Sequence, residues 1–418
     1  MPRQLSEWLS LLESSHPVEI DLGLDRVAKV AAQLSLKKPA PIVITVAGTN
    51  GKGSCVAVLQ GLIEAAGFST GIYTSPHLIR FNERVVIHGR QVDDQQFCEA
   101  FVEVEAARIA ADTSLTYFEF TTLAALLLIQ LANIDVALLE VGLGGRLDAV
   151  NLVDSDIGVV TGIALDHQSW LGDSLDSIGY EKASIARSGK PLVYGDSKPV
   201  ASVMETTANI GATLCQFGQD FNFVDDVFFS SLKRKVTVPQ SNLPRASIAC
   251  ALQVAELLGI NISEPNIYNA ISRISLTGRY QLLFCNNRQW LLDVAHNPQA
   301  AERLAGQLQR DFSNTRIIAV FAAMSDKDLT GIIQPLQDCI SLWVLPNLDL
   351  ERAANPQSLA ALLYNNETVP SVAQALERAR ELATEDDLIL VFGSFFLVGP
   401  VLEQLTESKG KVQNESVL

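Results

Sequence analysis

Short apolar runs alternate along the chain with longer stretches of helical periodicity. Runs that suit strands buried on both faces of a sheet occupy residues 42–46, 69–73, 135–141, 157–161 and 191–194. Apolar residues recur at the period of a helix over residues 53–66, 93–111, 118–131 and 175–186. This alternation predicts an α/β fold in which a parallel sheet carries helices on both faces.

The pattern changes near residue 221 and later resumes. Residues 221–238 mix aromatic and β-branched residues with Lys and Arg, which predicts a small antiparallel insertion before helices at 246–258 and 264–273. A second alternation then follows, with strands at 290–294, 316–321, 342–345 and 388–392 and helices at 298–310, 329–336 and 371–382. We expect two lobes, residues 1–278 and 279–418, with the functional site in a cleft between them.

The charge balance limits the classes of partner. The 418 residues include 31 Lys and Arg against 47 Asp and Glu, a formal net charge of −16. Such a charge opposes broad electrostatic attraction to nucleic acid or to an anionic membrane. We therefore expect neither partner, and an anionic ligand has to be held by a local site.

Cysteine usage and hydropathy indicate the compartment. The six cysteines are widely spaced, without a C-x-x-C pair or a zinc-like spacing. The most apolar run, residues 123–129, is far shorter than the roughly 18 residues that a membrane-spanning helix needs. The N-terminus lacks the basic start and the apolar stretch of a signal peptide. We expect a reduced, cytoplasmic protein.

A glycine-rich loop follows the first strand and opens a helix. It consists of Gly48, Thr49, Asn50, Gly51, Lys52, Gly53 and Ser54. Glycines let backbone N–H groups face phosphate oxygens, Lys52 adds a positive charge, and the Ser54 hydroxyl suits Mg²⁺. The spacing departs from the common P-loop, because Gly53 separates Lys52 from Ser54. The loop favours ATP over a dinucleotide, since no G-x-G-x-x-G is present; the alternative is a glycine-rich turn with a solvent-facing lysine.

Further charged groups follow the other strands. Glu140 ends an apolar strand, where a buried carboxylate suits either a Mg²⁺ ligand or an ion pair with a core arginine. Asp166 and His167 follow the next strand, and either a metal role or a hydrogen-bonded crevice histidine fits them. Lys182 lies in a helix with an apolar face, where the usual role is a solvated surface charge.

The second lobe repeats the arrangement of a strand followed by polar groups and a helix. Asp293 and His296 bracket the end of a strand, while Asn297 and Pro298 suit the cap and the first position of the next helix. Capping explains Asn297 and Pro298 but leaves Asp293 and His296 unexplained. These two residues therefore favour a ligand role.

Taken together, these motifs resemble the Mur ligase superfamily, and within it the family of bacterial bifunctional dihydrofolate synthases/folylpolyglutamate synthases. The resemblance runs through nearly the whole chain, over residues 21–27, 46–54, 74–78, 114–119, 140–151, 164–167, 181–183, 277–280, 293–298 and 391–395. It implies a P-loop, parallel-sheet ATPase domain followed by a smaller, Rossmann-like α/β domain that ligates glutamate.

The resemblance also implies the reaction. ATP phosphorylates a substrate carboxylate, and the amino group of L-glutamate attacks the resulting acyl phosphate. The acceptors implied are dihydropteroate and reduced folates, and the enzyme implied is a cytoplasmic monomer. Neutralising the anions that this chemistry brings together is the main demand on the site.

Each matching residue acquires a role by the resemblance. Lys52 and the loop amides hold the phosphates of ATP, and Arg279, Asp293 and His296 reach ATP from the hinge and the second lobe. Lys182 matches a lysine that the family carbamylates, which supports a second Mg²⁺. The implied metal-binding residues are Ser54, Ser75, Glu140, His167 and Lys182. The implied dihydropteroate pocket contains Thr116, Phe118, Asp148 and Ala149.

One departure and three alternatives remain. The superfamily usually has an Asn near adenine where this chain has Ser247, which leaves the base contact open. A muropeptide ligase of the same superfamily, a P-loop kinase or regulatory ATPase, and a non-enzymatic binding protein are the competing hypotheses. The segment 147–149 and the segment 114–119 favour a pterin substrate over a muropeptide.

Overall fold

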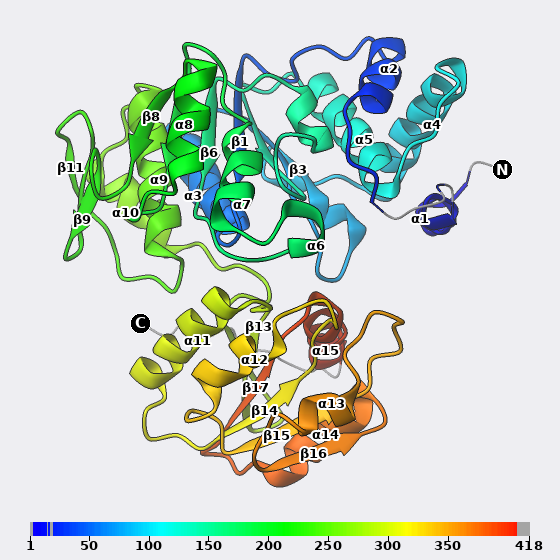
Figure 1. Ribbon diagram of the computed structural model, residues 1–418, viewed down its shortest axis with the longest axis vertical. Helices are drawn as coiled ribbons and strands as arrows, with labels where there is room; N and C mark the ends of the chain where they lie inside the picture. The colour runs from blue at the N-terminus through cyan, green and yellow to red at the C-terminus, as the bar shows by residue number, and fades with distance from the viewer. Residues whose placement is uncertain (1–2, 15, 17–19, 408–418) are drawn as a thin grey trace. The chain divides into compact units, whose positions relative to one another are not determined.

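The chain forms two compact units, residues 1–274 and 275–418 (Figure 1). The computed structural model describes residues 3–14, 16 and 20–407. Each unit is built on its own mixed sheet with helices against both faces. The α/β architecture expected from the sequence is confirmed.

The sheet of the first unit has eight strands in the order β4-β3-β2-β5-β1-β6-β7-β8. The strands are β1 (Ile42–Ala47), β2 (Thr70–Tyr73), β3 (Val85–Ile87), β4 (Arg90–Gln91), β5 (Val136–Glu140), β6 (Ile157–Val160), β7 (Pro191–Tyr194) and β8 (Thr213–Gln216). Neighbours pair in parallel along the six strands β2, β5, β1, β6, β7 and β8. Strands β3 and β4 add an antiparallel edge that the sequence pattern did not reveal.

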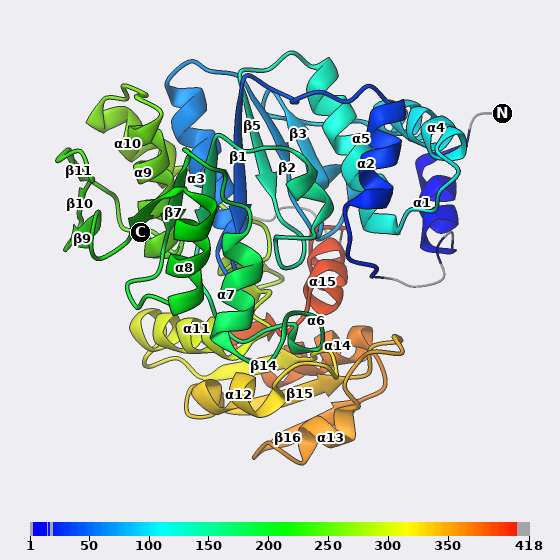
Figure 2. The same cartoon turned by 45° about the horizontal axis from the view of Figure 1, so that its top comes forward.

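Alternation along the strands sends side chains to two cores. In β1, Val43 and Ala47 join the core that includes side chains of α1, α2, α4, α5, α7 and α8, while Ile44 and Val46 join the core under α3, α9 and α10 (Figure 2). The helices are α1 (Leu5–Ser14), α2 (Asp25–Gln33), α3 (Lys52–Ala65), α4 (Asp94–Ala110), α5 (Tyr117–Leu131), α6 (Gln168–Leu171), α7 (Leu175–Ala183), α8 (Ala201–Ile210), α9 (Arg245–Leu257) and α10 (Glu264–Ser272).

Short elements complete the first unit. The predicted insertion is an antiparallel three-stranded sheet of β9 (Asn222–Val224), β10 (Val227–Phe229) and β11 (Lys235–Thr237). Two 3₁₀ helices, η1 (Phe81–Arg84) and η2 (Ala149–Leu152), follow β2 and β5 along the chain.

The second unit has a six-stranded sheet in the order β12-β13-β17-β14-β15-β16. Its strands are β12 (Gln281–Cys285), β13 (Arg288–Asp293), β14 (Ile317–Phe321), β15 (Leu342–Pro346), β16 (Asn366–Val369) and β17 (Leu388–Phe392). All neighbours pair in parallel except β12 and β13. The helical elements are α11 (Pro298–Asp311), α12 (Leu329–Ile333), η3 (Gln334–Leu336), α13 (Pro356–Ala360), α14 (Val372–Leu382) and α15 (Phe395–Glu407).

Some predicted boundaries are wrong. The helix expected to end at residue 186 ends at Ala183, and the helix expected over residues 329–336 divides into α12 and η3. Pro335 lies in the first turn of η3, and because proline has no N–H it cannot continue the hydrogen bonding of α12. Within the described residues, no helix combines the length and hydropathy needed to span a bilayer.

Candidate functional site

The glycine-rich loop joins β1 to α3 through two unusual backbone conformations. Gly48 has φ +146° and Gly51 has φ +86°, both in the region that favours glycine. A Cβ on Gly48 would lie 2.0 Å from Thr161 Oγ1, so a side chain at this position is excluded. The loop therefore needs glycine for its turn and for its close approach to the residue that follows β6.

Side chains from two other segments hold the loop in place. Thr161 Oγ1 donates a hydrogen bond to the Asn50 carbonyl (2.7 Å), and Thr49 Oγ1 accepts one from Ala164 N (3.0 Å). Ser247 Oγ, on α9, donates to the Gly51 carbonyl (2.9 Å). Ser247, noted above as a departure from the superfamily, is thus engaged with the phosphate loop itself.

Lys52 begins α3 and folds back over the loop. Its Nζ donates to the carbonyl oxygens of Gly48 (3.0 Å) and Thr49 (3.4 Å). This geometry places the ammonium group within the turn of the loop. Lys52 is half-buried, which suits the predicted phosphate role better than the alternative of a solvent-facing lysine.

Three further predicted metal residues lie at or after β2, β5 and β6, which together with β1 are four adjacent strands of the sheet. Ser75 follows β2, Glu140 ends β5 opposite Val46 of β1, and His167 follows β6. The carboxyl ends of parallel strands meet at one edge of a sheet, which is where open α/β folds bind ligands. Burial of the Cys55 thiol raises its pKa, and the negative charge of Glu140 raises it further. Glu140 therefore also lies near the first turn of α3, which carries Cys55.

An electrostatic cluster connects this edge to α7. Lys182 is buried, and burial first and the Lys52 charge second lower its pKa to about 7. Asp166 and Asp148 act in the opposite direction on the same ammonium group. Four charged side chains from four segments of the chain therefore lie close enough to influence one another.

Asp148 interacts with the phosphate loop and belongs to the expected dihydropteroate pocket. Burial raises its pKa to about 6, while three backbone N–H groups and Lys52 lower it. Its two oxygens accept hydrogen bonds from Leu143 N (2.8 Å) and Val150 N (2.9 Å). Asp148 caps η2, which begins with the buried Ala149.

The remaining pocket residues lie at the start of α5. Thr116 caps this helix in a capping box with Glu119. The ring of Phe118 lies against Gly142, because a Cβ at position 142 would be 2.5 Å from it. Phe118 also lies 6.2 Å from the Tyr73 ring, measured between centroids. The structure thus places an aromatic surface beside the segment that carries Asp148.

His167 and its neighbour differ in exposure. The His167 side chain is 41% exposed, whereas the Asp166 side chain is 6% exposed and accepts a hydrogen bond from His167 N (2.9 Å). Asp166 acts together with Asp148 on Lys182, although the resemblance assigned no role to Asp166. Its signal was available, since an aspartate shortly after a buried strand is as informative as Glu140 at the end of one.

The three predicted residues of the second unit also come together. Asp293, at the end of β13, accepts hydrogen bonds from Tyr280 N (2.8 Å) and Ala295 N (2.7 Å). Burial raises the pKa of this carboxyl, whereas the positive charges of Arg303 and Arg279 lower it. The Phe395 ring lies 5.9 Å from the Arg279 guanidinium and 6.0 Å from the His296 ring. Asn297 caps α11 as expected, by accepting a hydrogen bond from Ala300 N.

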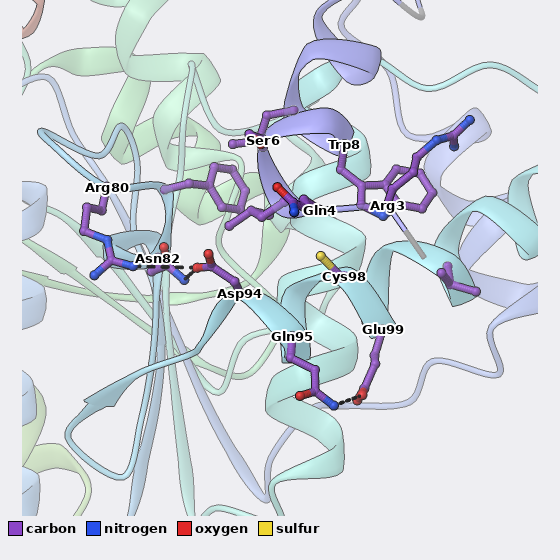
Figure 3. A pocket seen from close by; sticks show the side chains of 14 residues that line it. Arg3, Gln4, Ser6, Trp8, Arg80, Asn82, Asp94, Gln95, Cys98 and Glu99 are labelled. Carbon is purple, nitrogen blue, oxygen red and sulfur yellow. Dashed lines mark hydrogen bonds and ion pairs between the residues drawn. The ribbon is translucent and has the colours of Figure 1, made fainter. Parts of the chain in front are cut away.

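A separate pocket of about 740 Å³ lies between α1, η1 and α4 (Figure 3). None of the predicted site residues lines it. Its polar side chains bond to one another, with Asn82 Nδ2 2.9 Å from Asp94 and Gln95 Nε2 2.9 Å from Glu99. We therefore place the functional site at the strand ends and not in this pocket.

Comparison with known proteins decides the family. A protein from Escherichia coli K12 named dihydrofolate synthase/folylpolyglutamate synthase is 42% identical over 403 residues, which cover 96% of this chain and 95% of the relative. The chain belongs to the dihydrofolate synthase/folylpolyglutamate synthase family. The Haemophilus influenzae member is 35% identical and covers 94% of this chain, with 96% of its own length matched. Residues 278–395 match the model for the Mur ligase, glutamate ligase domain.

Solved structures of family members share the whole fold. The structure of E. coli FolC in complex with DHPP and ADP has a TM-score of 0.93 at 41% identity and covers 98% of this chain and 99% of its own. The Yersinia pestis enzyme complexed with AMPPNP and Mn ion has a TM-score of 0.91 at 40% identity and covers 97% and 98%. ATP and a divalent metal ion are the cofactors of this family.

The donor atoms at the strand ends suit a hard divalent cation. Ser54 and Glu140 are both buried and supply a hydroxyl and a carboxylate, the oxygen ligands that Mg²⁺ prefers. Among the described residues, no three His, Cys, Asp or Glu side chains gather as a metal site. The predicted set contains only two such residues, so the rest of its ligands would be hydroxyls, a modified lysine and the phosphates.

Proposed function

We propose that this chain joins L-glutamate to dihydropteroate, forming dihydrofolate, and then adds further glutamates to reduced folates, with ATP as the energy source. The observation that carries the proposal is the interaction of Lys52 with both Asp148 and Lys182. This interaction supports a single site that contains both the phosphate loop and the acceptor pocket. The names of the relatives that match nearly the full chain support the same activity.

The reaction proceeds in two steps. An oxygen of the acceptor carboxylate attacks the γ-phosphorus of ATP, the bond to the β-phosphate oxygen breaks, and ADP leaves. The neutral amino group of glutamate then attacks the carbonyl carbon of the acyl phosphate, and inorganic phosphate leaves as the amide forms and a proton is released. Lys52 and the loop amides hold the phosphates and neutralise the charge that develops on them.

Several residues position the other reactants. Phe118 and Asp148 bind the pterin, with the ring face against Phe118 and ring N–H groups toward the carboxylate. Thr116 and Ala149 line the same pocket. Arg279, Asp293 and His296 bind ATP from the second unit, and their grouping around Phe395 supports a shared role.

Ser54, Ser75, Glu140 and His167 would hold Mg²⁺. The ion supplies charge neutralisation to the phosphates when it is bound. The site is acidic and oxygen-rich at Glu140, which fits this group.

Lys182 is carbamylated in the active protein. Burial beside Lys52 lowers its pKa to about 7, so that a large fraction of the amine is neutral and nucleophilic at physiological pH. Attack of this amine on CO₂, with loss of a proton, converts a cation into an anion that supports a second Mg²⁺. The conversion also replaces a repulsion from Lys52 by an attraction.

The enzyme acts as a monomer in the cytoplasm. All six cysteines are free thiols, which suits a reducing compartment. Every residue assigned above to a substrate belongs to this one chain. Light scattering with and without ATP measures the oligomeric state. A dimer whose amount rises together with activity would contradict a monomeric enzyme.

A substrate panel with mass detection tests the function. With ATP and Mg²⁺, we expect glutamate-dependent ADP release with dihydropteroate and with tetrahydrofolate, and none with a UDP-muropeptide. Turnover with the muropeptide alone would identify the cell-wall ligase instead. ADP release without any acceptor would favour a regulatory ATPase, and loss of all turnover in Lys52→Ala is required in each case.

A further inference from the structure

Arg84 is a buried cation that the proposed reaction does not use. It is the last residue of η1 and is only 7% exposed. Its guanidinium carbon lies 5.4 Å from the centre of the Phe81 ring and 5.7 Å from that of the Tyr117 ring. Its Nε donates a hydrogen bond to His77 Nδ1 (2.9 Å).

Within residues 3–14, 16 and 20–407, no carboxylate lies within ion-pair distance of Arg84. None of the ion pairs there includes Arg84, whereas Arg26 pairs with both Asp21 and Glu119. Neither Nη atom of Arg84 is among the buried atoms that lack a hydrogen-bond partner, so both still reach solvent. A guanidinium that is buried without a carboxylate is costly, and its terminal N–H groups are suited to an incoming anion.

His77 is a neutral hydrogen-bond donor beside the Arg84 guanidinium. Its Nδ1 accepts the hydrogen bond from Arg84, so the proton of the neutral ring is on Nε2. The pair therefore offers N–H donors from both side chains, together with the positive charge of Arg84.

Arg84 lies beside the acceptor pocket. Its carbonyl oxygen accepts a hydrogen bond from Thr74 N (2.9 Å), next to Ser75, and its guanidinium contacts Tyr117, next to Phe118. The buried phenol of Tyr73 interacts electrostatically with both Arg84 and Asp148. The cation thus lies near the residues assigned to the acceptor and near the strand ends assigned to phosphoryl transfer.

We infer that Arg84 and His77 bind the α-carboxylate of the glutamate tail of a folate acceptor. The inference rests on the proposed function and deepens it. Dihydropteroate carries one carboxylate, and that group reacts. A folate carries two on its terminal glutamate, and the one that does not react has to be held beside the phosphates without repelling them. Arg84 is then a residue that distinguishes the second activity from the first.

The variant Arg84→Met tests this assignment by comparing the two acceptors. We expect kcat/KM for tetrahydrofolate to fall about 10- to 100-fold relative to kcat/KM for dihydropteroate, which is the range for losing a hydrogen-bonded charge. Arg84→Lys restores part of the loss because it keeps the cation. The control is Arg90→Met, which removes an exposed arginine on the neighbouring β4 and leaves the ratio unchanged.

A second arm uses the wild-type protein and does not depend on the folding of a variant. A tetrahydrofolate analogue that carries 4-aminobutyrate in place of glutamate lacks only the α-carboxylate. We expect the wild type to lose the same factor with this analogue, and Arg84→Met to treat the analogue and tetrahydrofolate alike. Equal kinetic constants for both compounds with the wild type would overturn the assignment.

The incoming glutamate offers the same chemical group, and the experiment separates the two sources. If Arg84 bound the incoming amino acid, the KM for glutamate would rise in Arg84→Met with both acceptors, which would overturn the inference. A parallel fall of kcat/KM for both acceptors would likewise reduce Arg84 to a structural role. Absence of wild-type turnover with either acceptor would instead refute the proposed function itself.

Discussion

At the scale of single residues, burial sets the chemistry of this site. Lys182 and Asp148 have their pKa values moved toward neutrality by the same cause, removal of the charged form from water. Buried groups whose pKa values lie near the working pH are typical of active sites. This leads to two expected outcomes, one for each group.

The first concerns the pH dependence of acceptor binding. Because the pKa of Asp148 is raised to about 6, the carboxylate becomes protonated as the pH falls from 7 to 5. Protonation weakens the acceptor that we propose for the pterin. The KM for dihydropteroate should rise over this range while the KM for ATP changes less. Steady-state kinetics between pH 5 and 8 measure both, and Asp148→Ala should raise the KM for dihydropteroate at every pH. Equal loss of affinity for ATP would contradict a pterin pocket at Asp148.

The second concerns carbamylation of Lys182. Enzyme prepared without CO₂ should have low activity that bicarbonate restores, and Lys182→Ala should lose at least about 100-fold in kcat, the scale for removing one group that stabilises transition-state charge. Short carboxylic acids such as acetate should partly rescue Lys182→Ala, since they supply the missing anion. Rescue by methylamine and not by acetate would show that the amine itself acts, and would refute the modification.

At the scale of elements, close packing couples the loop after β5 to α7. A Cβ on Gly145 would lie 2.6 Å from the Glu181 carbonyl oxygen and 3.1 Å from Lys182 Cα, and Arg146 N donates to that carbonyl (2.9 Å). The Arg146 side chain pairs with Glu181 as well (2.9 Å). The segment that carries Asp148 therefore rests directly on the helix turn that carries Lys182.

The substitution Gly145→Ala should separate these two segments. The added methyl group meets backbone atoms that have no rotamer to change, so we expect a loss of about 1–3 kcal/mol in the free energy of unfolding, as for other overpacked sites. Activity should fall further than stability explains. Gly306→Ala is the control, because a Cβ there meets nothing within 4 Å and alanine favours the helix. Chemical denaturation of both variants measures the difference, and unchanged stability of Gly145→Ala would contradict the packing argument.

Some of these elements could be predicted from the sequence, and others could not. Strands such as β1 and β5 were predictable because they are buried on both faces and are largely apolar. Helix α15 was not, since Pro400 lies inside it, and the β3–β4 edge was not, since its few residues are partly polar. The phosphate loop was predictable from glycine spacing, whereas Arg84 belongs to no motif and gains its meaning only from burial without an acidic partner.

At the scale of the whole molecule, a chain with net charge −16 has to bind anionic substrates. We propose that it does so with a few cations at the strand ends, where desolvation strengthens each interaction and solvent screens the distant acidic surface. Lys52 and Lys182 lie in the first unit, and Arg279 lies in the second. The residues proposed to bind the nucleotide therefore come from both units.

Arg279→Ala tests whether the second unit contributes to nucleotide binding. We expect the KM for ATP to rise about tenfold or more, since a charged hydrogen bond to phosphate is lost, with a smaller change in the KM for dihydropteroate. Arg273→Ala, at the end of α10 and exposed, is the matched control. An unchanged KM for ATP in Arg279→Ala would contradict a role of this second-unit residue in nucleotide binding.

The proposed reaction depends on phosphorylation of the acceptor carboxylate by ATP held on the loop around Lys52. Dihydropteroate labelled with ¹⁸O in both carboxylate oxygens tests it most directly, by mass analysis of the phosphate released during a glutamate-dependent turnover. If ATP phosphorylates the acceptor carboxylate, each phosphate carries one labelled oxygen, and Lys52→Ala releases none. Unlabelled phosphate formed together with dihydrofolate would contradict it.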